Sequence, residues 1–413
     1  ACLVGSEMCI RDSSGIGAVI FDEFHERSLN ADLGLALCLE VAGALRDDLI
    51  LLAMSATLDA GPVAELMRAP VITSQGRAFP VETRWLEAPL PKQRRFEDSM
   101  ADLIVQAAHE SKGGILAFLP GEGEIRRTEA KLRGRLPGDV TVRPLFGAMA
   151  FADQRAAIRP ESHGRKLVLA TAIAETSLTI EDIRVVVDGG RARRARFDPG
   201  AGMARLVTER VTRAEATQRA GRAGRVAEGV AYRLWTKGEE GALQAYPPAE
   251  IETADLAGLA LELALWGATP DDLPFLSPLN PGAFAEAQAL LQMLGALDDQ
   301  RRITAHGKAL AAVPLHPRLG HMLTLAGPEA APLAALLAER DPLTGAPTDL
   351  ALRLEAMRDP KRFEATRSYG LNRAALERIR AEAKRLRTRA KDARDETMSP
   401  AAMAALAYPD RIG

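Results

Sequence analysis

The sequence predicts an α/β protein built from two doubly wound parallel sheets, the first of them incomplete, followed by an all-α C-terminal region. Short apolar runs at 115–119, 140–145, 167–170 and 185–187 alternate with segments of helical spacing, which is typical of a parallel sheet. Two earlier runs, 15–21 and 49–54, share this character. After residue 238 the strand pattern stops, and leucine and alanine recur at helical spacing.

Polar side chains follow both strands predicted for the first sheet. Asp22 and Glu23 come directly after the run 15–21, and Ser55 and Thr57 come after the run 49–54. A helix is expected between them, from a cap at Asn30 to about residue 46. Because parallel strands end at one edge, and open α/β sheets bind ligands at that edge, the sequence predicts a ligand site there.

The second sheet carries two further polar segments. The strand 167–170 opens into a hydroxyl-rich stretch, 171–180, and a hairpin is expected at 191–205. The stretch 218–225 then places arginines at positions 219, 222 and 225, a spacing that predicts one shared helix face. Guanidinium groups match phosphate oxygens in a bidentate way, so this stretch is a candidate phosphate site.

The C-terminal region is predicted to be helical, with a small β-wing at 297–303 and a helical bundle from residue 317. The segment 371–394 carries nine basic and three acidic residues, and a solvated charged face explains it as well as nucleic-acid contact. Three histidines at 306, 316 and 321 lack a carboxylate or cysteine partner at metal-binding spacing, so we interpret them as structural.

Composition limits the class of protein. The net charge is −2 over 413 residues, so affinity for nucleic acid must come from local patches. One such patch is 184–225, which contains eleven arginines and four acidic residues. The three cysteines form no disulfide framework or zinc spacing, which favours a reducing, cytoplasmic compartment. No apolar run approaches the ~20 residues that span a membrane. Residues 1–13 lack the features of a signal peptide and are expected to be a non-native leader.

The order of these motifs resembles a known family. Asp22-Glu23-Phe24-His25 resembles the DEAH-type motif II of superfamily 2 helicases, and 55–57, 169–180 and 218–225 resemble motifs III, V and VI. The segment after strand 115–119 resembles motif IV. Phe24 in place of the usual alanine, together with 196–199 and 408–411, is similar to the bacterial HrpB group of DEAH/RHA helicases. The resemblance covers roughly residues 15–413.

This resemblance implies a domain organisation. Residues 14–91 would be a partial RecA-like domain with motifs II and III, and 92–238 a second RecA-like domain with motifs IV, V and VI. A winged-helix domain would follow at 239–312. Residues 313–413 would form a helical bundle and the start of the HrpB-type C-terminal region.

The resemblance also implies an ATP-dependent helicase that uses ATP and Mg²⁺, with sequence-tolerant contacts to a nucleic-acid backbone, RNA being favoured over DNA. Asp22 would hold Mg²⁺ through water, beside Glu23, which would act on the attacking water. The other implied roles are catalytic for His25, Gln218, Arg222 and Arg225, coupling for Ser55 and Thr57, nucleic-acid binding for Thr171 and Ser177, and nucleotide binding for Thr179 and Glu181, where the family usually has aspartate at 181.

One motif is missing from the sequence. No G-x-x-x-x-G-K-[ST] loop, which cradles nucleotide phosphates, occurs in the chain. We therefore expect a fragment that hydrolyses essentially no ATP alone. Two alternatives stay open: a non-catalytic nucleic-acid-binding remnant, and a translocase directed to DNA.

Overall fold

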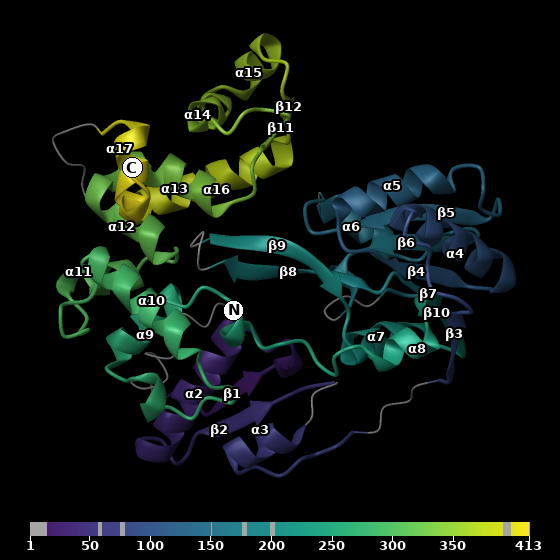
Figure 1. Cartoon of the computed structure of the whole chain (residues 1–413), viewed down its shortest axis with the longest axis horizontal. Coiled ribbons are helices and arrows are strands. Elements are labelled where there is room, and N and C mark those ends of the chain that lie inside the picture. Colours follow the sequence, from purple (N-terminus) through teal and green to yellow (C-terminus); the bar gives the residue numbers. More distant parts are fainter. Residues whose placement is uncertain are drawn as a thin grey trace. The chain divides into compact units, whose positions relative to one another are not determined.

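The computed structural model describes residues 15–56, 60–74, 79–149, 151–175, 180–198, 203–390 and 398–412. The chain forms two compact units, whose elements are labelled in Figure 1. We call Ile16–Ala31 with Asp48–Ala254 the sheet unit, and Asp32–Asp47 with Asp255–Gly413 the helical unit.

The sheet unit begins with a small parallel sheet. Strand β1 (Ala18–Phe21) pairs with β2 (Ile50–Ala53), and Phe21 lies opposite Ala53. Both strands fall within the runs 15–21 and 49–54, so the two strands predicted here are confirmed. Because the pairing is parallel, the segments that follow β1 and β2 leave from the same edge, where the main-chain N–H of Phe24 donates to the Met54 carbonyl at 2.9 Å.

Helix α2 (Leu29–Ala44) begins one residue before the predicted cap. The main-chain N–H of Ala31 donates to Ser28 Oγ at 3.2 Å, so the Ser28 hydroxyl satisfies an N–H of the first turn. The expected cap at Asn30 is therefore wrong, because Asn30 lies inside the helix.

A second, larger sheet forms the core of the sheet unit. Its six strands lie in the order β3-β10-β7-β4-β6-β5, and every neighbouring pair is parallel. The strands are β3 (Val81–Leu86), β4 (Gly114–Phe118), β5 (Val140–Leu145), β6 (Arg165–Ala170), β7 (Ile183–Asp188) and β10 (Gly229–Thr236). The strands β4 to β7 match the four predicted runs.

Helices cover both faces of this sheet. Alternate residues of a strand point to opposite faces. Ile115 and Ala117 of β4 pack in one apolar cluster with Ile104, whereas Leu116 and Phe118 pack in another with Ala220. The covering helices are α4 (Phe96–Glu110), α5 (Glu122–Leu132), α6 (Phe151–Ile158) and α7 (Arg213–Gly221). Burial on both faces explains why these strands are continuous apolar runs.

An antiparallel hairpin and short elements complete the sheet unit. Strands β8 (Arg191–Asp198) and β9 (Met203–Arg210) pair in antiparallel register, as predicted for 191–205. The remaining elements are α3 (Ala60–Met67), α8 (Lys237–Gly241), and the 3₁₀ turns η1 (Phe24–Glu26), η2 (Ala172–Ala174), η3 (Arg222–Gly224) and η4 (Glu250–Glu252).

Strand β3 precedes the boundary predicted between residues 91 and 92, yet it pairs with β10 in the larger sheet. The chain therefore enters this sheet before the Pro-rich stretch at 88–92. The predicted domain limits as a whole stay predictions.

The helical unit contains a series of short helices (Figure 1). An isolated antiparallel bridge joins Leu297 to Ile303, at the place predicted for a wing. The elements are α9 (Ala257–Trp266), η5 (Pro270–Asp272), α10 (Pro281–Met293), α11 (Ala305–Ala311), α12 (Pro317–Ala326), η6 (Gly327–Ala330), α13 (Ala331–Ala338), β11 (Leu343–Thr344), α14 (Leu350–Arg358), α15 (Pro360–Thr366), β12 (Gly370–Leu371), α16 (Arg373–Arg389), α17 (Pro400–Ala407) and η7 (Pro409–Arg411).

Four of these helices share one apolar core. Met322 of α12, Leu333 of α13, Ile379 of α16 and Met403 of α17 are buried in the same cluster. Across the described ranges, no helix combines the length and the apolar composition needed to cross a membrane.

Candidate active site

A strained turn follows β1 and carries the first group of predicted site residues. Glu23 and Arg27 flank η1 with φ angles of 51° and 49°, in the left-handed region that residues other than glycine seldom adopt. Each such residue costs about 1–3 kcal/mol, so the surrounding structure must hold the turn in place. Asp22 Oδ1 accepts the main-chain N–H of Glu23 at 2.9 Å, which orients the Asp22 carboxylate at the strand end.

Phe24 anchors this turn. Its side chain is 1% exposed, and its ring meets Phe21 edge-to-face with 6.2 Å between centroids. Its N–H donates to the carbonyl of Met54 at the end of β2. The aromatic side chain that distinguishes this motif from the usual alanine therefore fills space between the turn and the small sheet.

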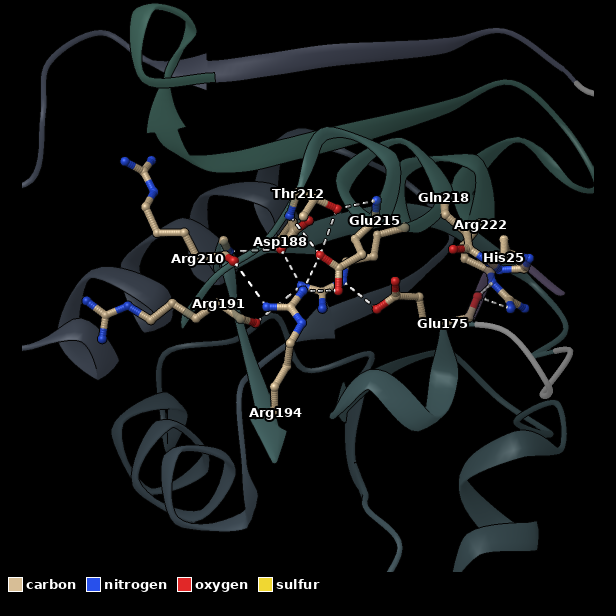
Figure 2. Close-up of polar contacts among 12 residues, drawn as sticks. His25, Glu175, Asp188, Arg191, Arg194, Arg210, Thr212, Glu215, Gln218 and Arg222 are labelled. Carbon is tan, nitrogen blue, oxygen red and sulfur yellow. Dashed lines mark hydrogen bonds and ion pairs between the residues drawn. The ribbon is translucent and has the colours of Figure 1, made fainter. Parts of the chain in front are cut away.

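His25 connects the turn to α7. Its Nε2 lies 3.0 Å from Gln218 Nε2 (Figure 2). Its Nδ1 lies 3.4 Å from Glu23 Oε2. The amide of Gln218 donates, so Nε2 must accept and the ring proton resides on Nδ1, the side that faces Glu23. Two residues 193 positions apart in sequence thus meet.

Helix α7 carries the second group of predicted site residues. It begins with a reciprocal capping box between Thr212 and Glu215, and it ends at Gly221, after which η3 continues the chain. The expectation that Arg219, Arg222 and Arg225 share one helix face is therefore wrong. Arg219 and Arg222 are 1% and 5% exposed, whereas Arg225 is on the surface.

Close packing at Gly224 accompanies this change of helix geometry. A Cβ atom added to Gly224 would lie 2.5 Å from the Phe79 carbonyl oxygen, and the N–H of Phe79 donates to the Gly224 carbonyl at 2.9 Å. A Cβ added to Gly221 would meet no atom within 4 Å. Only the second glycine of the repeat is thus required by a close backbone approach.

Arg222 points to the segment after β6. Its Nε donates to the carbonyl oxygen of Glu175 at 3.0 Å, and its Nη2 donates to the same oxygen. Burial lowers the pKa of Arg222 to about 10, with a further contribution from the positive charge of Arg225, while the charges of Glu175 and Glu23 act in the opposite direction. The carboxylate of Glu23 is thus near enough to act on this guanidinium.

The sequence analysis missed a buried ionic cluster beside these residues. Arg219 Nε donates to Glu175 Oε2 at 2.9 Å, and Arg219 Nη1 donates to Asp188 Oδ1 at 3.0 Å. Arg233 Nη1 donates to the other oxygen of Asp188 at 3.2 Å. The signals were present, since Asp188 ends a buried strand and Glu175 lies in the hydroxyl-rich stretch, but neither position identifies its partner.

The remaining predicted residues lie at strand ends or outside the described chain. Ser55 is exposed just after β2, and Glu181 is exposed in the turn before β7. Thr171 is half-buried between β6 and η2, and its N–H donates to the Leu145 carbonyl at 3.2 Å. The other three, Thr57, Ser177 and Thr179, lie outside the described residues.

Among the residues that the structure describes, no group of three or more His, Cys, Asp or Glu side chains is arranged to hold a metal ion. A Mg²⁺ ion that keeps several waters and binds phosphate oxygens needs only one or two carboxylates. Asp22 is exposed at the strand end beside the half-buried Glu23, so this hard-oxygen donor set fits such an ion.

Comparisons with known proteins point to one family. Residues 97–227 match the family described as helicase conserved C-terminal domain. The chain is 49% identical over 336 residues to the ATP-dependent RNA helicase HrpB of Escherichia coli, covering 79% of this chain and 41% of that protein. It is 33% identical over 316 residues to the ATP-dependent RNA helicase HrpA homolog of Haemophilus influenzae, covering 74% and 24% of the two chains.

Solved structures agree with this result. The DEAH/RHA helicase HrpB of Escherichia coli matches with a TM-score of 0.84 at 42% identity, over 98% of this chain and 50% of that chain. A structure described as the E. coli DExH-box NTPase HrpB matches with a TM-score of 0.78 at 40% identity, over 98% and 49%. The chain spans half or less of the length of these relatives. From its motifs, its fold and these similarities, the chain belongs to the HrpB group of the DEAH/RHA helicase family.

Proposed function

We propose that the chain is part of an ATP-dependent RNA helicase that couples nucleotide hydrolysis to movement along a nucleic-acid strand. The observation that carries this proposal is the contact between His25 and Gln218 at 3.0 Å, which joins the carboxylate turn after β1 to the arginine-bearing helix. Relatives named ATP-dependent RNA helicases support it.

The carboxylate turn would serve the attacking water and the metal. Asp22 would hold Mg²⁺ through water, and the ion would supply positive charge to the phosphates of ATP. Glu23 would orient or deprotonate the water, because its half-buried carboxylate lies just after β1, with Oε2 3.4 Å from His25 Nδ1. His25 would position Glu23, and its contact with Gln218 would couple the carboxylate turn to α7.

The arginines would stabilise negative charge on the transferred phosphoryl group. Arg222 and Arg225 lie next to each other at η3, where the charge of Arg225 acts on Arg222. Arginines in this role are worth about 10³–10⁵ in rate. Gln218 would help to place the water, since its side chain is already held near Glu23 through His25.

The other assignments concern the nucleotide, the strand and the coupling between them. We propose that Thr171 and Ser177 bind phosphates of the nucleic acid, and that Thr179 and Glu181 lie near the bound nucleotide. Ser55 and Thr57 would link hydrolysis to motion of the sheets. Phosphate contacts give salt-dependent, sequence-tolerant binding. We favour RNA as the strand and the cytoplasm as the location.

The test compares the 413-residue chain with a longer form of the protein that also carries a P-loop. We expect RNA to stimulate ATP hydrolysis by the longer form and essentially no hydrolysis by the chain alone. Glu23→Gln should lower kcat of the longer form by about 10²–10⁴-fold. Glu26→Gln, which removes an exposed carboxylate from the same turn, is the matched control and should leave kcat near that of the unmodified protein.

Two results would favour the alternatives. A longer form that binds RNA but hydrolyses no ATP would indicate a non-catalytic nucleic-acid-binding protein. Stronger stimulation by single-stranded DNA than by RNA of the same length would indicate a DNA-directed translocase. Robust RNA-stimulated ATP hydrolysis by the 413-residue chain would contradict the expectation that hydrolysis requires a P-loop, a motif that this chain lacks.

A further inference from the structure

Glu175 makes two kinds of contact at once. Its carboxylate accepts from the buried guanidinium of Arg219 at 2.9 Å, and its carbonyl oxygen accepts from Arg222 at 3.0 Å (Figure 2). The residue is 6% exposed and follows η2 directly. Glu175 is thus a link between a structural arginine and an arginine assigned to the reaction.

The carboxylate end of this link is tightly held. Arg219 is 1% exposed, contacts Glu175 and Asp188, donates to the Arg191 carbonyl at 3.3 Å, and lies over the ring of Phe118. Asp188 is fully buried and also accepts from Arg233. Two cations therefore face two anions in the interior, and each charge depends on the others for compensation.

Electrostatics agree with this geometry. Burial alone would lower the pKa of Arg219, but the charges of Glu175 and Asp188 outweigh it, so the pKa of Arg219 is raised and the group stays protonated. Burial raises the pKa of Glu175, and the charge of Arg219 opposes that effect. The ion pair thus favours the charged form of the Glu175 carboxylate, against the effect of burial.

The carbonyl end of the link determines where Arg222 lies. Arg222 is 5% exposed, and two of its nitrogens donate to the single carbonyl oxygen of Glu175. A carbonyl oxygen can hold a guanidinium in one place only if its own peptide is fixed. The pair with Arg219 restrains the Glu175 peptide from the carboxylate side, and the Glu175 N–H, which donates to the Ala172 carbonyl at 2.8 Å, restrains it from the main-chain side.

We propose that Glu175 is a positioning residue: its ion pair with Arg219 fixes the peptide whose carbonyl oxygen holds Arg222 in place for phosphoryl transfer. This inference rests on the proposed role of Arg222. If the ionic cluster only stabilised the packing of α7 against β7, loss of the Glu175 carboxylate would leave the position of Arg222 unchanged. The two possibilities therefore differ in what happens to Arg222 when the carboxylate is lost.

The first experiment observes Arg222 directly in the 413-residue chain, without ATP. The chain is labelled with ¹⁵N-arginine, and the Nε–H signal of Arg222 is assigned by its loss in Arg222→Lys. In Glu175→Gln we expect the Nε–H of Arg222 to exchange with solvent at least about tenfold faster. Arg219→Lys, which keeps the positive charge but removes the guanidinium fork, should have the same effect on Arg222 and serves if Glu175→Gln does not fold.

The matched control is Glu161→Gln, which removes the carboxylate that accepts from Arg143 Nε at 2.7 Å on β5. It should leave the Arg222 signal unchanged. The inference is overturned if Arg222 exchanges at its original rate in folded Glu175→Gln or folded Arg219→Lys, or if Glu161→Gln perturbs it equally.

The second experiment separates positioning from folding in the longer form that hydrolyses ATP. We expect Glu175→Gln to lower kcat by about 10–100-fold with KM for ATP changed much less, and Glu175→Asp to recover part of the loss. Equal kcat values for the unmodified protein, Glu175→Gln and Glu175→Asp would contradict the inference. If the longer form hydrolyses no ATP, the proposed function fails, but the exchange rate of Arg222 still decides whether Glu175 positions it.

Discussion

The two glycines of the arginine stretch have different structural roles. Gly221 ends α7 with open space where a Cβ would lie, whereas a Cβ on Gly224 would meet the Phe79 carbonyl oxygen at 2.5 Å and the Val81 side chain at 2.8 Å. The difference follows from tertiary packing, because the residues around both glycines are the same, alanine before and arginine after. The close approach of Phe79 and Val81, at the start of β3, to Gly224 distinguishes them.

This contrast gives a matched pair of substitutions. Gly224→Ala should lower the free energy of unfolding by more than about 1 kcal/mol, because the added carbon cannot fit without a backbone shift. Gly221→Ala should be neutral or raise it by up to about 1 kcal/mol through reduced unfolded-state entropy. Urea unfolding of both variants, followed by circular dichroism, measures the difference. Equal effects would show that the approach of Phe79 to Gly224 is not a constraint.

Two helices of the sheet unit begin with the same capping box. Thr212 and Glu215 cap α7, and Thr236 and Glu239 cap α8, with the same reciprocal bonds. Both carboxylate oxygens of Glu215 also accept from Nη2 of Arg194 on β8, whereas Glu239 Oε1 lies 3.8 Å from Arg210 Nη2. The capping box of α7 thus also attaches the hairpin to the helix that carries Gln218.

Glu215→Gln should therefore destabilise the protein more than Glu239→Gln. Both changes weaken a capping box, which costs about 1 kcal/mol. Glu215→Gln also removes the charged carboxylate that Nη2 of the half-buried Arg194 contacts, and leaves Arg194 with its 3.3 Å contact to Glu209, for which we expect about 1 kcal/mol more. Paired thermal unfolding curves of the two variants would show this difference, and an identical loss in both would mean that the Arg194 contact contributes nothing to stability.

A contacting pair of histidines makes the stability of the whole chain sensitive to acid. In the helical unit, His306 Nε2 and His321 Nδ1 lie 2.8 Å apart. Burial, and secondarily the charge of His306, lowers the pKa of His321 from 6.5 to about 4. The histidines that the sequence analysis interpreted as structural include this contacting pair, whose hydrogen bond needs one of the two contacting nitrogens to stay unprotonated as the acceptor.

The sign of the pH effect follows from this shift. The unfolded chain takes up a proton at His321 near pH 6.5 and the folded chain only near pH 4, so the contribution is complete above pH 6.5 and is lost as the pH falls toward 4. Allowing for the half-buried position, we expect a loss of about 1–2 kcal/mol. His321→Leu should flatten the stability curve between these pH values, as measured by urea unfolding at several pH values. An unchanged slope would exclude His321 as a source of acid sensitivity.

Much of the fold could be predicted because its signals are local. Alternation along a buried strand sends Ile115 and Leu116 to opposite faces of the sheet, and this requires only a period of two and burial on both sides. Candidate site residues were predicted for the same reason. Asp22 and Glu23 follow a strand whose end must lie at the sheet edge, so their position depended on nothing distant in the chain.

The groups that the arginines contact in the folded chain could not be predicted from local patterns. Arg219 and Arg222 stand three residues apart in one motif, yet one is neutralised by Glu175 and Asp188 and the other is held by a carbonyl oxygen. The expectation of one shared face considered only the helix itself. Its failure comes from partners more than thirty positions away, which no local period describes.

Local patterning along this chain was sufficient to specify the strand runs, the order of the motifs and the residue types present at the sheet edge, because each depends on neighbours within a few positions. Folding of the whole chain was needed to bury Arg219 within an ionic cluster, to make Gly224 but not Gly221 a close-packed position, and to bring His25 against Gln218. The physical reason is that burial, close approach and charge compensation are properties of what surrounds a residue in space, and those surroundings are assembled from segments far apart in sequence.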